Sequence, residues 1–178
     1  MATAVPSFGQ LPTIPHWIDG KKLITGSERI GEVFNPAIGK AESRVEFASA
    51  EECNAAIAAA DRALESWSRT PAVQRARLMF RFRELLERHR NELAQLVSRE
   101  HGKVVDDSLG SIQRGIDNVE FACGLPQLLK GEFSEQVGSG VDVWSMRQPV
   151  GVCVGITPFN FPVMVPLWMF PIAITCGN

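Results

Sequence analysis

Apolar residues recur every three or four positions through the middle of the chain, which predicts a series of amphipathic helices. Ser49 and Glu52 form the pattern of a capping box at the start of the first helix. Its apolar stripe comprises Cys53, Ala56, Ile57, Ala60, Leu64 and Trp67. Thr70 and Pro71 predict the N-cap and first turn of a second helix. Two further helices are expected, one ending at Gly102 and one carrying Leu109, Ile112, Ile116 and Val119.

Strand patterns flank the helices. PHWIDGKKLI predicts a β-hairpin, because Asp19-Gly20 can supply the positive φ of a tight turn. Residues 28–48 predict two more strands around an Asn35-Pro36 turn. Residues 131–150 predict a loop or hairpin that leads to a strand. PVGVCVGIT is apolar and β-branched throughout, as expected of a parallel strand buried on both faces. A closing helix is expected to end near Gly177.

The run from Gln148 to Asn178 carries no charge, and Val150 to Ile174 is long enough to cross a bilayer. Four prolines, Pro158, Pro162, Pro166 and Pro171, interrupt residues 150–174, and a proline inside a helix removes a hydrogen-bond donor. Thr157 and Asn160 would also place polar groups in hydrocarbon. We therefore predict a strand, a sharp loop and a helix of a protein core, and no membrane span.

Composition sets broad limits. The 178 residues are 45% hydrophobic and 21% charged with a net charge of −2, which is typical of an ordinary globular protein. The slightly acidic balance predicts no general attraction to nucleic acid or anionic lipid. Four scattered cysteines form no zinc or redox motif, and each is expected to be a small buried hydrophobe. MATAVPSFGQLPTIP resembles neither a secretory signal nor a transit peptide, which predicts a cytoplasmic protein or a mature organellar one.

The loop TPFNFP is the candidate site. Ligands of open α/β sheets bind where strands end and helices begin, and residues 157–162 hold that position. The dinucleotide fingerprint GxGxxG is absent. Asn160 lies between two phenylalanines and two prolines, and an amide in so stiff a loop could donate to a developing oxyanion. From the residues alone, a simple turn role for Asn160 remains open.

ITPFNFPVMVPLWMFPIAITCGN resembles the segment of aldehyde dehydrogenases that carries the catalytic asparagine. The form TPFNFP followed by PLWMFP is most similar to that of methylmalonate-semialdehyde dehydrogenases. HWIDGK, FNPAIGK, SREHGK, RGIDNVEFACG and RQPVGV follow in the family's order, so the resemblance covers nearly the whole chain. The closing motif is specific, whereas the others are individually weak.

The resemblance implies an α/β fold with a Rossmann-like NAD-binding domain, a catalytic domain and an oligomerisation β arm. Residues 1–130 would supply the outer strands and helices of the NAD-binding domain, and residues 131–148 part of the arm. Residues 149–178 would form the first strand, loop and helix of the Rossmann-like core. The catalytic domain is expected to lie outside this chain. A homo-oligomer, a dimer of dimers, is also implied.

The resemblance assigns roles to particular residues. Asn160 would be the catalytic oxyanion donor, and the NAD site would be lined by Ile156, Thr157, Pro158 and Phe159. Arg114 would bind the carboxylate of a semialdehyde acid, with a surface salt bridge as the alternative. No metal site is expected.

The implied activity is oxidation of methylmalonate or malonate semialdehyde with NAD, followed by transfer of the acyl group to CoA and loss of CO2. It requires a cysteine thiolate, and none of Cys53, Cys123, Cys153 and Cys176 has a neighbour in sequence that would lower its pKa. The nucleophile is therefore expected outside this chain. Two alternatives stay open: a non-acylating aldehyde dehydrogenase, and a non-catalytic module that binds a partner.

Overall fold

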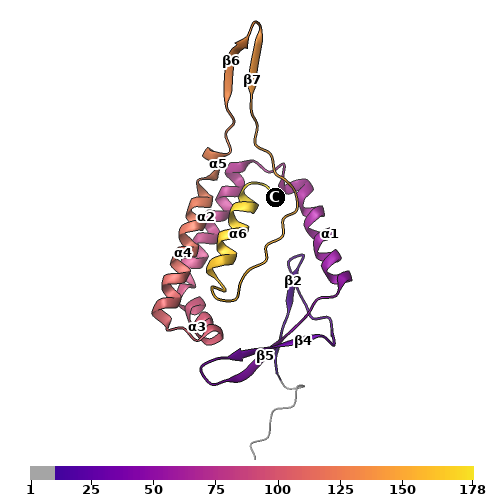
Figure 1. Cartoon of the computed structure of the whole chain (residues 1–178), viewed down its shortest axis with the longest axis vertical. Helices are drawn as coiled ribbons and strands as arrows, with labels where there is room; N and C mark the ends of the chain where they lie inside the picture. Colours follow the sequence, from indigo (N-terminus) through magenta and orange to yellow (C-terminus); the bar gives the residue numbers. More distant parts are fainter. Residues whose placement is uncertain (1–10) are drawn as a thin grey trace, which may run out of the picture.

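The computed structural model describes residues 11–178, and a layer of packed helices forms its centre (Figure 1). The helices are α1 (Ala50–Trp67), α2 (Ala72–Arg88), α3 (Arg90–His101), α4 (Val105–Cys123), α5 (Leu125–Leu128) and α6 (Met164–Thr175). Helix α4 packs against α2, α3 and α6, so it is the element on which the others are arranged. The cellular compartment was predicted from residues 1–15. Residues 1–10 of this stretch lie outside the described residues.

Short strands lie on both sides of the helical layer. The strands are β1 (Thr13–Ile14), β2 (His16–Ile18), β3 (Lys21–Leu23), β4 (Ile30–Asn35), β5 (Lys40–Glu46), β6 (Phe133–Gly138) and β7 (Val141–Trp144). One sheet has the order β1-β5-β4, with β1 parallel and β4 antiparallel to β5. Strands β2 and β3 form the predicted hairpin, whose turn residues Asp19 and Gly20 have φ of 52° and 70°. Strands β6 and β7 form a second hairpin that projects away from the helices (Figure 1).

The core lies along one face of α4. Ile112, Ile116 and Val119 are fully buried, as their spacing predicts. Gly115 lies on the same face, where a Cβ atom would be 2.6 Å from Cδ1 of Leu167. The absence of a side chain at Gly115 therefore allows α4 and α6 to approach closely, and this contact fixes the helix that follows the candidate loop.

Two side chains attach the end of α6 to the other helices. The indole Nε1 of Trp67 donates to the carbonyl of Ile174 at 2.9 Å, and Nε of Arg75 donates to the carbonyl of Thr175 at 2.9 Å. The Arg75 side chain is buried, and this burial lowers its pKa. Carbonyls at the end of a helix lack intrahelical partners, and the bond from Arg75 supplies one to Thr175. The Ile174 carbonyl also accepts from the N–H of Gly177 at 2.9 Å, so Trp67 adds a second bond there.

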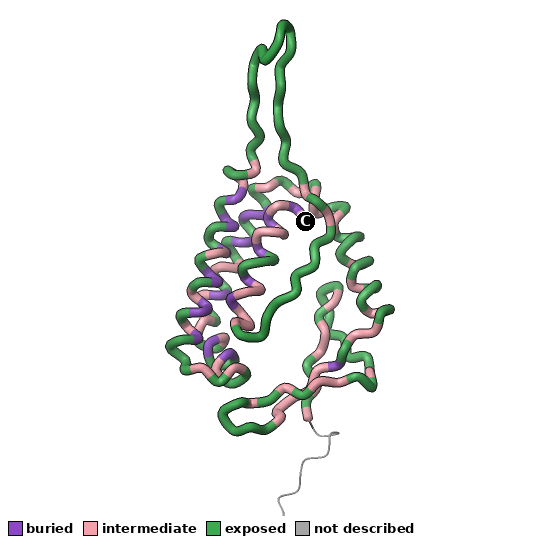
Figure 2. Tube along the Cα trace, in the orientation of Figure 1, coloured by how far each residue is buried: buried purple, intermediate pink, exposed green. Residues whose placement is uncertain are grey.

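The segment predicted as a buried strand is not a strand in this structure. Residues 149–158 run as an extended chain with no strand pairing, and Val150, Val154 and Ile156 are 87%, 77% and 88% exposed (Figure 2). The start of the segment is held by Asn178, whose Oδ1 accepts from the N–H of Val150 at 2.7 Å. A strand needs a neighbour for its backbone groups, and no described strand lies beside this segment. The prediction of burial on both faces is thus wrong for the described residues.

Three further predictions also differ from the structure. Helix α1 is amphipathic but contains no buried residue, because its apolar stripe lacks a complete covering layer. Cys53 and Cys153 are exposed, whereas Cys123 is buried, so the prediction that every cysteine is buried is wrong. Thr70 does not cap α2, because its hydroxyl donates to the carbonyl of Ser66 at 3.1 Å.

Within residues 11–178, no helix combines the length and apolarity needed to cross a membrane.

The predicted capping box of α1 is present. The N–H of Glu52 donates to Oγ of Ser49 at 3.2 Å, and the N–H of Ser49 donates to the Glu52 carboxylate at 2.6 Å. We expect Ser49→Ala to lower the free energy of unfolding by about 1 kcal/mol, because an orphan N–H loses its acceptor. Urea denaturation measures this change, with Ser66→Ala on the exposed part of α1 as the control. Equal effects of the two substitutions would contradict the capping role.

Candidate active site

The candidate loop joins the extended segment to α6. Asn160 lies in a turn just before this helix, and the following residue, Phe161, is partly buried. Among residues 11–178, the side chain of Asn160 makes no hydrogen bond or ion pair, and the residue is exposed. Its amide is therefore free to donate to a ligand, as an oxyanion donor requires.

Phe161 contacts two cations, one from the middle of α4 and one from the turn before this helix. Nζ of Lys103 lies 4.4 Å from the centroid of the Phe161 ring, and Cζ of Arg114 lies 5.6 Å from it. Both distances are within the range of attractive cation–π contacts. The two cations also converge on the hydroxyl of Ser111, at 3.4 Å from Lys103 and 3.3 Å from Arg114. The structure thus places Arg114 in contact with the residue that follows Asn160.

The two cations differ in charge balance. Lys103 forms an ion pair with Asp107 at 3.1 Å. Among the described residues, Arg114 has no carboxylate within ion-pair distance. The alternative of a surface salt bridge at Arg114 therefore finds no support between residues 11 and 178. The Arg114 guanidinium has an unneutralised charge beside the candidate loop and is exposed to an incoming anion.

Backbone and side-chain bonds fix α4 against α6 at this point. The indole Nε1 of Trp168 donates to the carbonyl of Arg114 at 3.3 Å. Nδ2 of Asn118 donates to the carbonyl of Leu167 at 2.8 Å. Since the two helices also meet at Gly115, Arg114 and the loop before α6 are held on one rigid pair of helices.

The residues predicted to line an NAD site form one continuous exposed stretch. Ile156 and Phe159 are 88% and 91% exposed, and Thr157 and Pro158 between them are also exposed. No described strand pairs with the backbone of this stretch. Apolar side chains and free backbone groups are what a nicotinamide nucleotide would contact, so these residues fit such a ligand. Their role remains a prediction.

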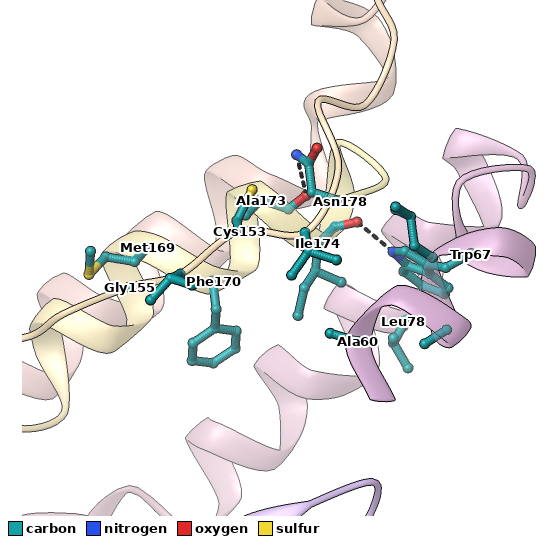
Figure 3. Close-up of a pocket in the computed structure, with 14 residues that line it drawn as sticks. Ala60, Trp67, Leu78, Cys153, Gly155, Met169, Phe170, Ala173, Ile174 and Asn178 are labelled. Carbon is teal, nitrogen blue, oxygen red and sulfur yellow. Dashed lines mark hydrogen bonds between the residues drawn. The ribbon is translucent and has the colours of Figure 1, made fainter. Parts of the chain in front are cut away.

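A large groove lies elsewhere in the described chain. It has a volume of about 580 Å³ and lies between α1, the extended segment and α6 (Figure 3). Trp67, Leu78, Met169 and Ile174 are among its lining residues, and none of the predicted site residues is. Its walls are almost entirely apolar and carry no ionisable group besides Cys153, so it offers no set of polar groups for catalysis.

One described cysteine, Cys123, is poorly suited to be a nucleophile. Burial raises the pKa of the Cys123 thiol, which disfavours its nucleophilic thiolate form. Cys153 is exposed, and its Sγ lies 3.6 Å from the carbonyl of Gly151 with no cation beside it. Within residues 11–178, no group of three or more histidine, cysteine, aspartate or glutamate residues could hold a metal ion.

Lys103 and Asp107 were missed by the sequence analysis. Gly102 ends α3 with φ of 85°, so the chain turns and directs Lys103 toward the start of α4. Lys103 and Asp107 are four residues apart, and the spacing of opposite charges is the signal that could have indicated their pairing. Their proximity to Phe161 depends on the packing of α4 against α6, which no local pattern reports.

Comparison with known proteins decides the family. The model of the "Aldehyde dehydrogenase family" matches residues 23–178, which is most of the chain. The chain belongs to the aldehyde dehydrogenase family. This confirms the family and the α/β fold class predicted from the TPFNFP segment and the motifs before it. The residue roles are not decided by this match.

Several relatives and two solved structures that this aldehyde dehydrogenase chain matches are named malonate- or methylmalonate-semialdehyde dehydrogenases. Malonate-semialdehyde dehydrogenase of Pseudomonas aeruginosa is 48% identical over 93% of the chain and 33% of its own length. The acylating, mitochondrial methylmalonate-semialdehyde dehydrogenase of Arabidopsis thaliana is 45% identical over 94% of the chain and 28% of its own length. The crystal structure of the Oceanimonas doudoroffii methylmalonate-semialdehyde dehydrogenase matches with a TM-score of 0.92 and 54% identity, over 94% of the chain and 34% of that protein.

A protein from Sinorhizobium meliloti, assigned as a methylmalonate-semialdehyde dehydrogenase and solved in complex with NAD, matches with a TM-score of 0.91. It is 47% identical, over 94% of the chain and 34% of its own length. The aldehyde dehydrogenase chain described here thus spans about a third of the length of the relatives that it matches.

Proposed function

We propose that this chain is the N-terminal part of an NAD-dependent, CoA-acylating dehydrogenase of malonate or methylmalonate semialdehyde. The observation that carries this proposal is the unneutralised Arg114, which contacts the residue next to Asn160. An aldehyde that bears a carboxylate would find a cation and an amide donor at the same loop. The subgroup of the similar proteins supports the same substrate class.

The residues of this chain would act on the substrate in two ways. A cysteine thiolate supplied from outside the chain attacks the aldehyde carbon, and the carbonyl electron pair moves to oxygen. Asn160 donates its amide N–H to that oxyanion, while Arg114 holds the substrate carboxylate. NAD supplies the hydride acceptor when bound, and Ile156, Thr157, Pro158 and Phe159 would line its site.

CoA is proposed as the co-substrate that receives the acyl group. Oxidation of the thiol adduct, with NAD as the hydride acceptor, would leave a thioester on the enzyme cysteine. The thiol of CoA would lose its proton and attack the thioester carbon, and the enzyme cysteine would leave as its thiolate. The substrate carboxylate is lost as CO2, so malonate semialdehyde gives acetyl-CoA and methylmalonate semialdehyde gives propionyl-CoA. A non-acylating enzyme would use water in place of CoA.

Assembly and location are part of the same proposal. Every residue of β6 and β7 is exposed in the single chain, and the hairpin projects from the helices (Figure 2). We expect a partner subunit to cover it in a homo-oligomer built as a dimer of dimers. The proposed location is the cytoplasm, or the mitochondrial matrix after processing.

A panel of aldehydes tests the substrate class on the longest natural polypeptide that carries this sequence. We expect NADH formation to be most efficient with malonate or methylmalonate semialdehyde, less efficient with neutral propanal, and least efficient with cationic betaine aldehyde. The ratio of kcat/KM for malonate semialdehyde to kcat/KM for propanal reports the contribution of Arg114. A preference for the neutral or the cationic aldehyde would contradict the proposal.

The exposed segment 150–156 favours a second candidate, a module that binds a partner. Such an apolar, unpaired edge promotes association with another chain. We expect the 178-residue chain on its own to self-associate as its concentration rises, and Val154→Lys to reduce this association. Size-exclusion chromatography with light scattering measures it, with Val73→Lys on exposed α2 as the control. A monomer at every concentration would contradict the candidate.

A further inference from the structure

Lys103 is an almost buried cation with three fixed contacts. Its side chain is 10% exposed, although lysine is rarely buried. Its ammonium group contacts the Asp107 carboxylate at 3.1 Å, the Ser111 hydroxyl at 3.4 Å and the Phe161 ring at 4.4 Å from the centroid. An ammonium group has three N–H donors, and the contacts with Asp107 and Ser111 engage two of them. Lys103 is therefore held in one place.

One partner of Lys103, Ser111, is itself fixed by burial and by a hydrogen bond. Ser111 is buried, and its hydroxyl donates to the carbonyl of Asp107 at 3.0 Å within α4. Asp107 and Ser111 both lie on the first turns of α4, the central helix of the fold. The cation on the Phe161 ring thus belongs to the rigid part of the molecule rather than to a mobile surface side chain.

We propose that Lys103 is a positioning residue, which holds the Phe161 ring and thereby the adjacent Asn160 amide in place. The inference rests on the proposed role of Asn160 as oxyanion donor. Asn160 has no hydrogen bond of its own among the described residues, so its position depends on its neighbours in the chain. Phe161 is the partly buried neighbour, and its ring contacts both Lys103 and Arg114.

Lys103 and Arg114 are expected to have different roles despite their common contacts. The charge of Lys103 is balanced by Asp107, and its side chain is only 10% exposed, so we do not expect it to bind a substrate carboxylate. Arg114 has no such counter-charge among residues 11–178 and is exposed. Loss of Lys103 should therefore change the rate of the chemical step, and loss of Arg114 the affinity for a charged aldehyde.

The experiment uses the complete natural polypeptide and the substitution Lys103→Met, which keeps the side-chain length and removes the charge. We expect kcat to fall about 10-fold or more for both malonate semialdehyde and neutral propanal, because a misplaced catalytic group slows every substrate. KM for malonate semialdehyde should change much less than kcat. Lys103→Arg, which keeps a cation over the ring, should restore part of kcat. An unchanged kcat, or an effect confined to KM for the charged aldehyde, would overturn the proposal.

A double-mutant cycle separates positioning from general stability. If Lys103 acts through Asn160, Lys103→Met should cost little in a protein that already carries Asn160→Ala. Additive losses would show that Lys103 acts elsewhere and would overturn the inference. Lys40→Met, at an exposed lysine of β5, is the matched control for charge removal.

Two further arms keep the test decisive. If Lys103→Met fails to fold by circular dichroism, Asp107→Asn, which frees the ammonium group, should lower kcat in the same manner, and an unchanged kcat would overturn the inference. If the unmodified enzyme oxidises propanal but not malonate semialdehyde, the proposed substrate is wrong, while the propanal rates still test Lys103. The two failures are thus distinguishable.

Discussion

Replacing Asn160 by alanine should lower kcat for every aldehyde by roughly 100-fold or more, because the oxyanion loses a donor that is positioned before the reaction begins. The Asn160 side chain makes no hydrogen bond within residues 11–178, so its removal should leave the fold intact. Steady-state formation of NADH in the complete polypeptide measures the effect. The thermal unfolding midpoint, measured in parallel, should remain the same.

Asn91→Ala is the matched control, since Asn91 is an exposed asparagine at the start of α3. This substitution should leave kcat unchanged. Near-normal turnover of Asn160→Ala would remove Asn160 from the mechanism and leave it the role of a turn residue.

Replacing Arg114 by methionine should raise KM for malonate semialdehyde by about 10- to 100-fold. A hydrogen bond to a charged group contributes about 1.5–3 kcal/mol, and 1.4 kcal/mol corresponds to a factor of about ten. KM for propanal should remain almost unchanged, because that aldehyde has no carboxylate. The change in the ratio of the two KM values is the informative quantity.

Arg81→Met serves as the control for loss of a positive charge, because Arg81 is exposed on α2. It should affect neither KM. An equal rise in KM for propanal and for malonate semialdehyde after Arg114→Met would show that Arg114 shapes the entrance without binding a carboxylate.

The parts of the fold that depend on local chemistry could be predicted from the sequence. The Ser49–Glu52 capping box, the Asp19-Gly20 turn and the buried face of α4 each follow from residues close together in the chain. The strand predicted over residues 149–157 is not formed in this structure, and its absence could not be predicted in this way. A strand is stable only beside another strand, and no described residue supplies one to this segment.

The candidate site could also be predicted only where it depends on residues close together in the chain. The stiff loop around Asn160 is visible in the sequence because its prolines and phenylalanines are adjacent. Arg114 was predicted through the family resemblance, since 46 residues separate it from Asn160. Its missing counter-charge, and the contact of Lys103 with Phe161, depend on the packing of α4 against α6. Such contacts between distant segments have no local signature.

The measurement that tests the proposed function most directly is mass spectrometry of the products formed by the complete polypeptide. The protein is incubated with malonate semialdehyde and NAD, with and without CoA. We predict one acetyl-CoA and one CO2 for each NADH when CoA is present, and little turnover to free acid when CoA is omitted. Free malonate or acetate formed at the same rate with and without CoA would contradict the acylating reaction.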